Sequence, residues 1–152
     1  MPKSVKRLTM AENKALYVLD ASVILKWFLE ETENREQAVR LKDEYIDGDI
    51  KISIPFYAYS EILNTLGRLV SKPKAISALS FLYNLRFVEY EISYAHAHFA
   101  IDIMNHYQAV SFYDAGYHAL ALDQNITLIT ADKKYYQKVK KRGNIVFLGD
   151  YK

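Results

Sequence analysis

The stretch LYVLDASVILKW, residues 16–27, places one acid, Asp20, between two apolar runs. Its first four residues are short, continuous and apolar, which is typical of a strand buried on both faces of a parallel sheet. The residues after Asp20 predict a helix over 21–30. Asp20 would then lie at the carboxyl end of a strand, where open parallel sheets bind ligands. A helix cap is the alternative explanation for this acid.

The alternation of strand and helix continues along the chain. Four further apolar runs predict strands: IKISI at 50–54, FVEYEI at 87–92, ITLIT at 126–130 and NIVFL at 144–148. Apolar residues at helical spacing lie between them: Ala38, Leu41 and Tyr45; Ile62, Leu66 and Leu69; Ile92, Ala95, Phe99 and Ile103. Pro55 and Pro73 each suit the first turn of a helix. The pattern predicts an α/β fold built on a parallel sheet.

Composition predicts one domain. With 152 residues, 51% of them hydrophobic, the chain can bury one substantial core, and we expect it over 16–152 after a flexible basic leader over 1–15. No apolar stretch is long enough to span a bilayer, so we expect a cytoplasmic protein with no membrane partner. The absence of cysteine excludes disulfides, thiolate metal sites and cysteine nucleophiles.

Three further acids have placements comparable to that of Asp20. Asp132 follows the strand ITLIT by two residues, Asp114 lies near the start of a helix in SFYDAGYHALAL, and Glu61 shares a polar helical strip with Asn64 and Arg68. Capping or the helix dipole is the alternative for the two aspartates. Carboxylates that converge repel one another unless a cation neutralises them, and oxygen ligands suit magnesium or manganese.

The ordered set of motifs YVLDASVILKWF, SEILNTL, SFYDAGYHALAL and LITADKKY resembles the four acidic motifs of the PIN-domain ribonucleases. The similarity extends from Leu16 to Leu148 and is closest to the VapC-type toxins of toxin-antitoxin pairs. It implies a three-layer α/β/α fold with a parallel sheet of about five strands, a homodimer, and an endoribonuclease that depends on Mg²⁺ or Mn²⁺. A VapB-type antitoxin, with an apolar strip and a basic side chain near the acids, would be the protein partner.

Carried onto this chain, the resemblance assigns the catalytic and metal-binding roles to Asp20, Glu61, Asp114 and Asp132. Asp20 and Asp114 would ligate the principal ion, and Ser22 and Thr130 would be the supporting polar residues. Water activated by the ion would cleave RNA to leave a 5′-phosphate and a 3′-hydroxyl.

The basic run KKYYQKVKKR at 133–142 holds six basic residues and no acid. Beside the acids it would attract RNA phosphates, with Lys133 and Lys134 as the candidate contacts and Arg68 as a third. A solvated helix face and an ordinary ion pair are the alternatives. His118 is either a proton carrier or a structural histidine.

Two other functions stay open at this point. One is a housekeeping RNA-processing PIN nuclease, or a phosphoesterase acting on a smaller substrate. The other is a non-catalytic PIN-fold module that binds RNA or protein. The intact set of four acids favours an enzyme, and the short chain favours a toxin.

Overall fold

The computed structural model describes residues 14–30 and 33–152, so most of the expected leader lies outside the described residues. Five parallel strands form one sheet in the order β3-β2-β1-β4-β5. Their bounds are β1 Ala15–Leu19, β2 Ile50–Pro55, β3 Val88–Tyr90, β4 Thr127–Thr130 and β5 Ile145–Phe147. All five predicted strands are confirmed, and so is the predicted α/β class. Ala15 already belongs to β1 and not to the leader.

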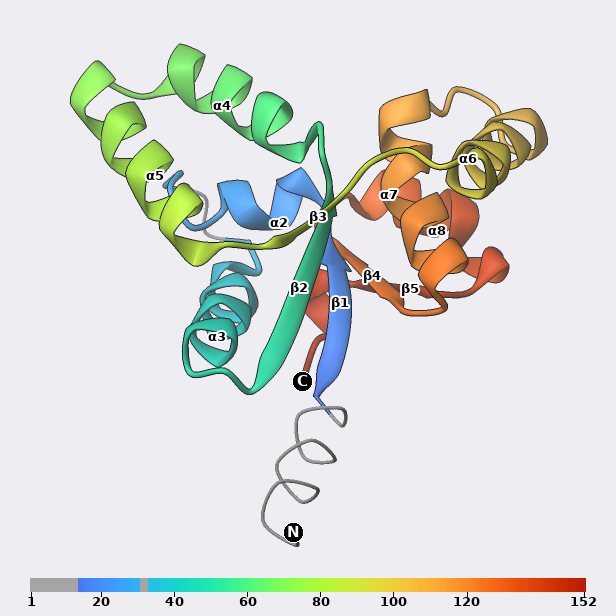
Figure 1. Cartoon of the computed structure of the whole chain (residues 1–152), viewed down its shortest axis with the longest axis horizontal. Helices are drawn as coiled ribbons and strands as arrows, with labels where there is room; N and C mark the ends of the chain where they lie inside the picture. The colour runs from blue at the N-terminus through green and yellow to red at the C-terminus, as the bar shows by residue number, and fades with distance from the viewer. Residues whose placement is uncertain (1–13, 31–32) are drawn as a thin grey trace, which may run out of the picture.

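Seven α-helices cover the sheet within the described residues. They are α2 Ala21–Leu25, α3 Arg35–Ile46, α4 Ala58–Leu69, α5 Lys72–Leu85, α6 Tyr94–His106, α7 Phe112–Gln124 and α8 Lys133–Val139. Helices α2 to α5 lie on one side of the sheet and α6 to α8 on the other (Figure 1). This division follows from right-handed crossovers, because the chain moves from β1 to β3 in one direction and then returns past β1 to β4 and β5. None of these helices is long and apolar enough to cross a bilayer.

The order of the strands creates a switch point between β1 and β4. The chain leaves β1 toward β2 on one side and leaves β4 toward β5 on the other. The carboxyl ends of these two central strands are therefore the place where an open α/β sheet binds ligands. Val18 pairs with Leu128 and Leu19 with Ile129, and all four side chains are buried. Apolar burial thus fixes the register that brings the two strand ends together.

The predicted helix over 21–30 is wrong in length, because α2 ends at Leu25. Beyond this point, Lys26 and Trp27 donate their backbone N–H groups to the carbonyls of Val23 and Ile24, three residues earlier. These shorter hydrogen-bond spacings show that turns replace the α-helix after Leu25. The indole of Trp27 donates to the Ala38 carbonyl in α3 at 2.8 Å, so Trp27 is a buried core residue that attaches the segment after α2 to α3.

Three smaller predictions about helices also need correction. Pro55 is the last residue of strand β2 and does not start a helix. Ile92 lies before α6, and the Leu69 side chain is 65% exposed at the end of α4 instead of covering the sheet. Pro73 lies in the first turn of α5 as predicted, behind the N-cap Ser71.

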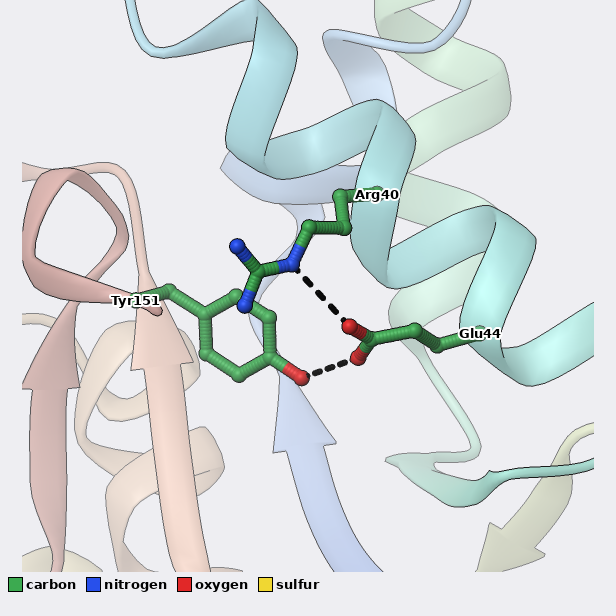
Figure 2. Close-up of polar contacts among 3 residues, drawn as sticks. All are labelled: Arg40, Glu44 and Tyr151. Carbon is green, nitrogen blue, oxygen red and sulfur yellow. Dashed lines mark hydrogen bonds and ion pairs between the residues drawn. The ribbon is translucent and has the colours of Figure 1, made fainter.

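The last residues of the chain are attached to α3. Figure 2 shows the Tyr151 hydroxyl donating to one carboxylate oxygen of Glu44, while Arg40 Nε donates to the other at 3.0 Å. The Arg40 guanidinium also lies 5.2 Å from the centroid of the Tyr151 ring. The edge of that ring meets Tyr17 of β1. These contacts hold the segment after β5 across the amino-terminal half of the fold.

Candidate active site

Asp20 lies directly after β1 and caps α2. Its backbone is extended, and its N–H donates to the Ile129 carbonyl of β4 at 3.1 Å. One carboxylate oxygen accepts from Ser22 Oγ at 3.0 Å and from Thr130 Oγ1 at 2.7 Å. Asp20 therefore does cap helix α2, as the alternative explanation predicted. The contact with Thr130, however, comes from another strand, and it orients the carboxylate toward the switch point.

The hydroxyl groups of Ser22 and Thr130 connect the carboxyl ends of β1 and β4 by hydrogen bonds. Ser22 Oγ accepts from the Ala131 N–H at 3.1 Å, and Thr130 Oγ1 accepts from the Asp132 N–H at 3.1 Å. Each hydroxyl therefore donates to Asp20 and accepts from the segment that follows β4. This arrangement couples the position of Asp20 to that of Asp132.

Asp132 and Asp114 both lie at the starts of helices. Asp132 caps α8, where its Oδ1 accepts from the Tyr135 N–H at 2.9 Å. Asp114 lies in the first turn of α7, and its N–H donates to the N-cap Ser111. Partial desolvation and the charge of Asp132 raise the pKa of Asp114, against the hydrogen bond from Ser111. The two carboxylates are thus close enough to repel each other.

Glu61 lies in the first turn of α4, on the other side of the sheet from Asp114. Desolvation and the charges of Asp20 and Asp114 raise its pKa to about 7. Its Oε1 is buried and accepts no hydrogen bond from the residues that the structure describes. A buried carboxylate oxygen without a partner is costly, and a cation would satisfy it.

The four acids therefore share one region. Asp20, Glu61 and Asp114 act on one another electrostatically, and Asp132 acts on Asp114. Over residues 14–30 and 33–152, however, no three acidic or histidine side chains are close enough together to hold one ion. The donor set suits a hard divalent cation in its chemistry: all ligand atoms are oxygens, and one of them lacks a partner.

The basic candidates have different surroundings. Lys133 and Lys134 are exposed at the start of α8, and Arg68 is exposed in the last turn of α4. Farther along the basic run, Lys138 donates to the Gln108 carbonyl and Arg142 pairs with Asp102 of α6. The latter two cations stabilise the packing of the C-terminal part of the chain.

A model of the PIN domain matches residues 17–141 of the chain. The chain belongs to the PIN-domain family. None of the curated proteins compared with the chain matches it significantly in sequence.

Several solved structures share the PIN fold of this chain. VapC20 of Mycobacterium tuberculosis, described as a sarcin-ricin loop cleaving toxin, is 14% identical with a TM-score of 0.61, over 80% of this chain and 93% of that one. VapBC-1 of nontypeable Haemophilus influenzae is 17% identical with a TM-score of 0.64, over 88% and 98%. DNA-bound VapBC of Salmonella typhimurium is 10% identical with a TM-score of 0.67, over 88% and 98%. At these identities the likeness shows the fold.

Three buried tyrosines surround the acids of this PIN domain, and sequence reasoning did not single them out. They are Tyr57, Tyr117 and Tyr135. Desolvation raises the pKa of each phenol first, and the charges of nearby acids raise it further. The usable signal was their spacing, since each lies three or four residues from Glu61, Asp114 or Asp132 in the sequence.

His118 is a structural residue of the PIN domain. Its ring is buried, and Nε2 lies 2.7 Å from the Gly143 carbonyl, an acceptor, so Nε2 carries the proton. Nδ1, 3.2 Å from the Tyr135 hydroxyl, then accepts. Burial lowers the pKa of His118, which favours this neutral form. The ring therefore uses both nitrogens to hold Tyr135 and the segment after α8.

Proposed function

We propose that this PIN domain is a metal-dependent endoribonuclease, the toxin of a VapBC-type toxin-antitoxin pair. The observation that carries the proposal is the partnerless, buried Oε1 of Glu61 beside the charges of Asp20 and Asp114. The charges of Asp20 and Asp114 raise the pKa of the Glu61 carboxyl, and a divalent cation bound among these acids would offset that repulsion.

Asp20 and Asp114 would hold the principal ion, with Glu61 and Asp132 completing the set. A bound Mg²⁺ or Mn²⁺ supplies Lewis acidity, which makes water a stronger nucleophile and offsets charge on the departing oxygen. Ser22 and Thr130 keep the Asp20 carboxylate oriented by donating to it. Lys133, Lys134 and Arg68 attract the phosphates of the RNA. Cleavage would leave a 5′-phosphate and a 3′-hydroxyl, as the family implies.

The partner of this nuclease would be a VapB-type antitoxin. A groove of about 480 Å³ has an apolar floor that includes Trp27, Phe28, Leu66 and Phe81, and its lining also includes the charged residues Glu30, Arg35, Lys42 and Lys74. A groove of this kind suits the apolar strip of an antitoxin. The toxin would act as a homodimer in the cytoplasm.

The test compares purified wild type with Asp20→Asn and Asp114→Asn on a mixture of RNAs, with EDTA, Mg²⁺ or Mn²⁺. Asparagine removes the charge while keeping the shape, so both variants should fold normally and lose metal-dependent cleavage. Asp47→Asn, an exposed position after α3, is the matched control and should cleave like wild type.

Wild-type activity in both site variants would overturn the assignment. Stabilisation of the wild type by the ion, without cleavage of any RNA, would favour the non-catalytic module instead. Mapping the ends of the cut RNAs would identify the target.

A further inference from the structure

The side chain of Tyr117 in α7 is completely buried, yet its hydroxyl forms no hydrogen bond with the residues that the structure describes. The other two tyrosines near the acids use their hydroxyl protons. Tyr57 donates to the Tyr113 carbonyl at 2.9 Å. Tyr135 donates to Nδ1 of His118 at 3.2 Å. A buried hydroxyl without a partner is destabilising, and phenylalanine would fill the same space without that cost.

Two helices place the Tyr117 hydroxyl beside the acids. Tyr117 lies one helical turn after Asp114 in α7, and its ring meets the Tyr57 ring edge-on at a centroid distance of 5.5 Å. Tyr57 is the N-cap residue of α4, and its carbonyl accepts from the Glu61 N–H at 3.2 Å. Tyr117 therefore packs between the turn that carries Asp114 and the turn that carries Glu61.

The surrounding charges agree with this placement. Burial raises the pKa of the Tyr117 phenol first, and the charges of Asp20 and Glu61 raise it further. The N–H of Ala21, the residue after Asp20, acts in the opposite direction. An N–H can interact only with the phenol oxygen, so it leaves the hydroxyl proton unused.

Glu61 is the acceptor that fits this donor. One carboxylate oxygen of Asp20 already accepts from Ser22 and Thr130. In contrast, Oε1 of Glu61 is buried and accepts no hydrogen bond from the described residues. A donor without an acceptor and an acceptor without a donor therefore lie in one region. A carboxylate that ligates a cation is ionised, and a hydrogen bond from a neighbouring group orients such a ligand.

We propose that Tyr117 is a positioning residue of the ion site: in the ion-bound protein its hydroxyl donates to the Glu61 carboxylate and holds it in the orientation that ligates a divalent cation. This inference rests on the proposed function for the nature of the site. It adds a hydroxyl that links the two helical layers, because Tyr117 comes from α7 and Glu61 from α4.

The test measures the Kd of Mn²⁺ by isothermal titration calorimetry, without RNA, for wild type and Tyr117→Phe. Phenylalanine keeps the ring and removes only the hydroxyl. The loss of a group that orients a metal ligand should raise the Kd by roughly 10- to 100-fold. In EDTA, the Tm of Tyr117→Phe should equal or exceed that of wild type, because the lost hydroxyl has no partner among the described residues.

Tyr59→Phe is the matched control. It makes the same chemical change at a buried tyrosine of α4, where Glu89 is the acid, among the described residues, whose charge acts on the phenol. This variant should bind Mn²⁺ with the Kd of wild type.

Glu61→Ala removes the acceptor and shows whether Tyr117 acts through it. Adding Tyr117→Phe to Glu61→Ala should change the Kd by less than about 2-fold, because the two residues contribute one interaction. The full effect of Tyr117→Phe in this background would show that the hydroxyl acts on another group, and it would overturn the inference.

Three further results would overturn it. The first is a wild-type Kd in Tyr117→Phe. The second is a Tm of Tyr117→Phe in EDTA below that of wild type, since the hydroxyl would then stabilise the fold without an ion. The third is a wild type that binds no Mn²⁺.

Cleavage of RNA at increasing Mn²⁺ concentrations separates this inference from the proposed function. If wild type cleaves and Tyr117→Phe reaches half-maximal cleavage at the same ion concentration, the role of Tyr117 is refuted and the nuclease remains. If wild type binds Mn²⁺ in a way that depends on the hydroxyl but cleaves no RNA, the nuclease is refuted and the role of Tyr117 remains.

Discussion

At the scale of the residue, opposing effects act on the pKa of the Asp20 carboxyl. Burial and the charge of Asp114 raise the pKa of its carboxyl, while the hydrogen bonds from Thr130 and Ser22 lower it. The two hydroxyls therefore favour the ionised form that a cation needs. Thr130 is completely buried, so its hydroxyl serves only Asp20 and the Asp132 N–H among the hydrogen bonds of the described residues.

Replacing Thr130 with valine should damage both the fold and the site. The change keeps the shape but leaves a carboxylate and a backbone N–H without their partner. We expect the free energy of unfolding to fall by about 1–3 kcal/mol, and Tm to fall by about 2–4 °C for each kcal/mol. RNA cleavage should fall as well. Thermal unfolding and cleavage assays measure the two effects.

Thr130→Ser keeps the hydroxyl and should recover most of the lost activity. Thr127→Val, on the same strand but half-buried, should change little. Equal effects of the valine substitution at positions 127 and 130 would contradict the role given to the Thr130 hydroxyl.

The carboxyl of Glu61 should make stability depend on pH in the absence of metal. Its pKa is raised from 4.5 to about 7 in the folded state, so its contribution is fully present below about pH 4.5 and is lost as pH rises through 7. In EDTA, the Tm of wild type relative to Glu61→Gln should therefore decrease from pH 5 to pH 8. The pKa of His118 is lowered, so its contribution makes stability increase with pH. Both proteins contain His118, so the comparison cancels this contribution. Parallel Tm curves for the two proteins would refute this prediction.

At the scale of the element, the strands were predictable because each is a short segment rich in apolar and β-branched residues, of which Leu16–Leu19 is continuously apolar. The end of α2 at Leu25 was not, because Trp27 beyond it is buried through a hydrogen bond to Ala38 of α3, a contact between distant residues that leaves no periodic signal. The four acids were recognisable from their places after strands or in first helical turns. The tyrosines around them were hidden among thirteen of that type.

Glycine is unfavourable inside a helix, yet helix α7 contains Gly116. Packing against Tyr57 explains why. A Cβ at Gly116 would overlap the hydroxyl of Tyr57. The His96 ring of α6 also lies 2.7 Å from the Gly116 carbonyl through Nε2. The close approach of the Tyr57 hydroxyl to α7 depends on this missing side chain.

Gly116→Ala should therefore destabilise the protein by about 1–3 kcal/mol, as overpacking does. Gly67→Ala in α4 is the matched control, because nothing lies within 4 Å of the added Cβ. That change should be neutral or stabilising by up to about 1 kcal/mol. Chemical denaturation gives both values.

Adding Tyr57→Phe to Gly116→Ala removes the overlapping hydroxyl and should recover part of the lost stability. A double variant no more stable than Gly116→Ala would show that the overlap is not the cause.

At the scale of the whole molecule, the acidic site joins both sides of the sheet. Glu61 comes from the layer of α2 to α5, and Asp114 and Asp132 come from the layer of α6 to α8 (Figure 1). The charge of Asp114 raises the pKa of Glu61, so the two layers bring carboxylates that repel each other into one region. An ion that binds there would relieve this repulsion and would bind only the folded chain.

Mg²⁺ or Mn²⁺ should therefore raise the Tm of wild type in a concentration-dependent way. At a concentration 100 times Kd the stabilisation is about 2.7 kcal/mol. Asp20→Asn should lose most of this effect, whereas Asp47→Asn should keep it. Differential scanning calorimetry gives the shifts, and equal shifts in Asp20→Asn and wild type would place the ion elsewhere.

The hydrogen bond between Thr130 and Asp20 spans 110 residues of sequence. During synthesis, the first strand emerges from the ribosome long before its partner β4 has been translated. A nascent chain that stops short of position 130 thus lacks both the central pairing of the sheet and the hydroxyl that orients the first acid. The pairing of β1 with β4 and the orientation of Asp20 can therefore form only after residue 130 has been synthesised.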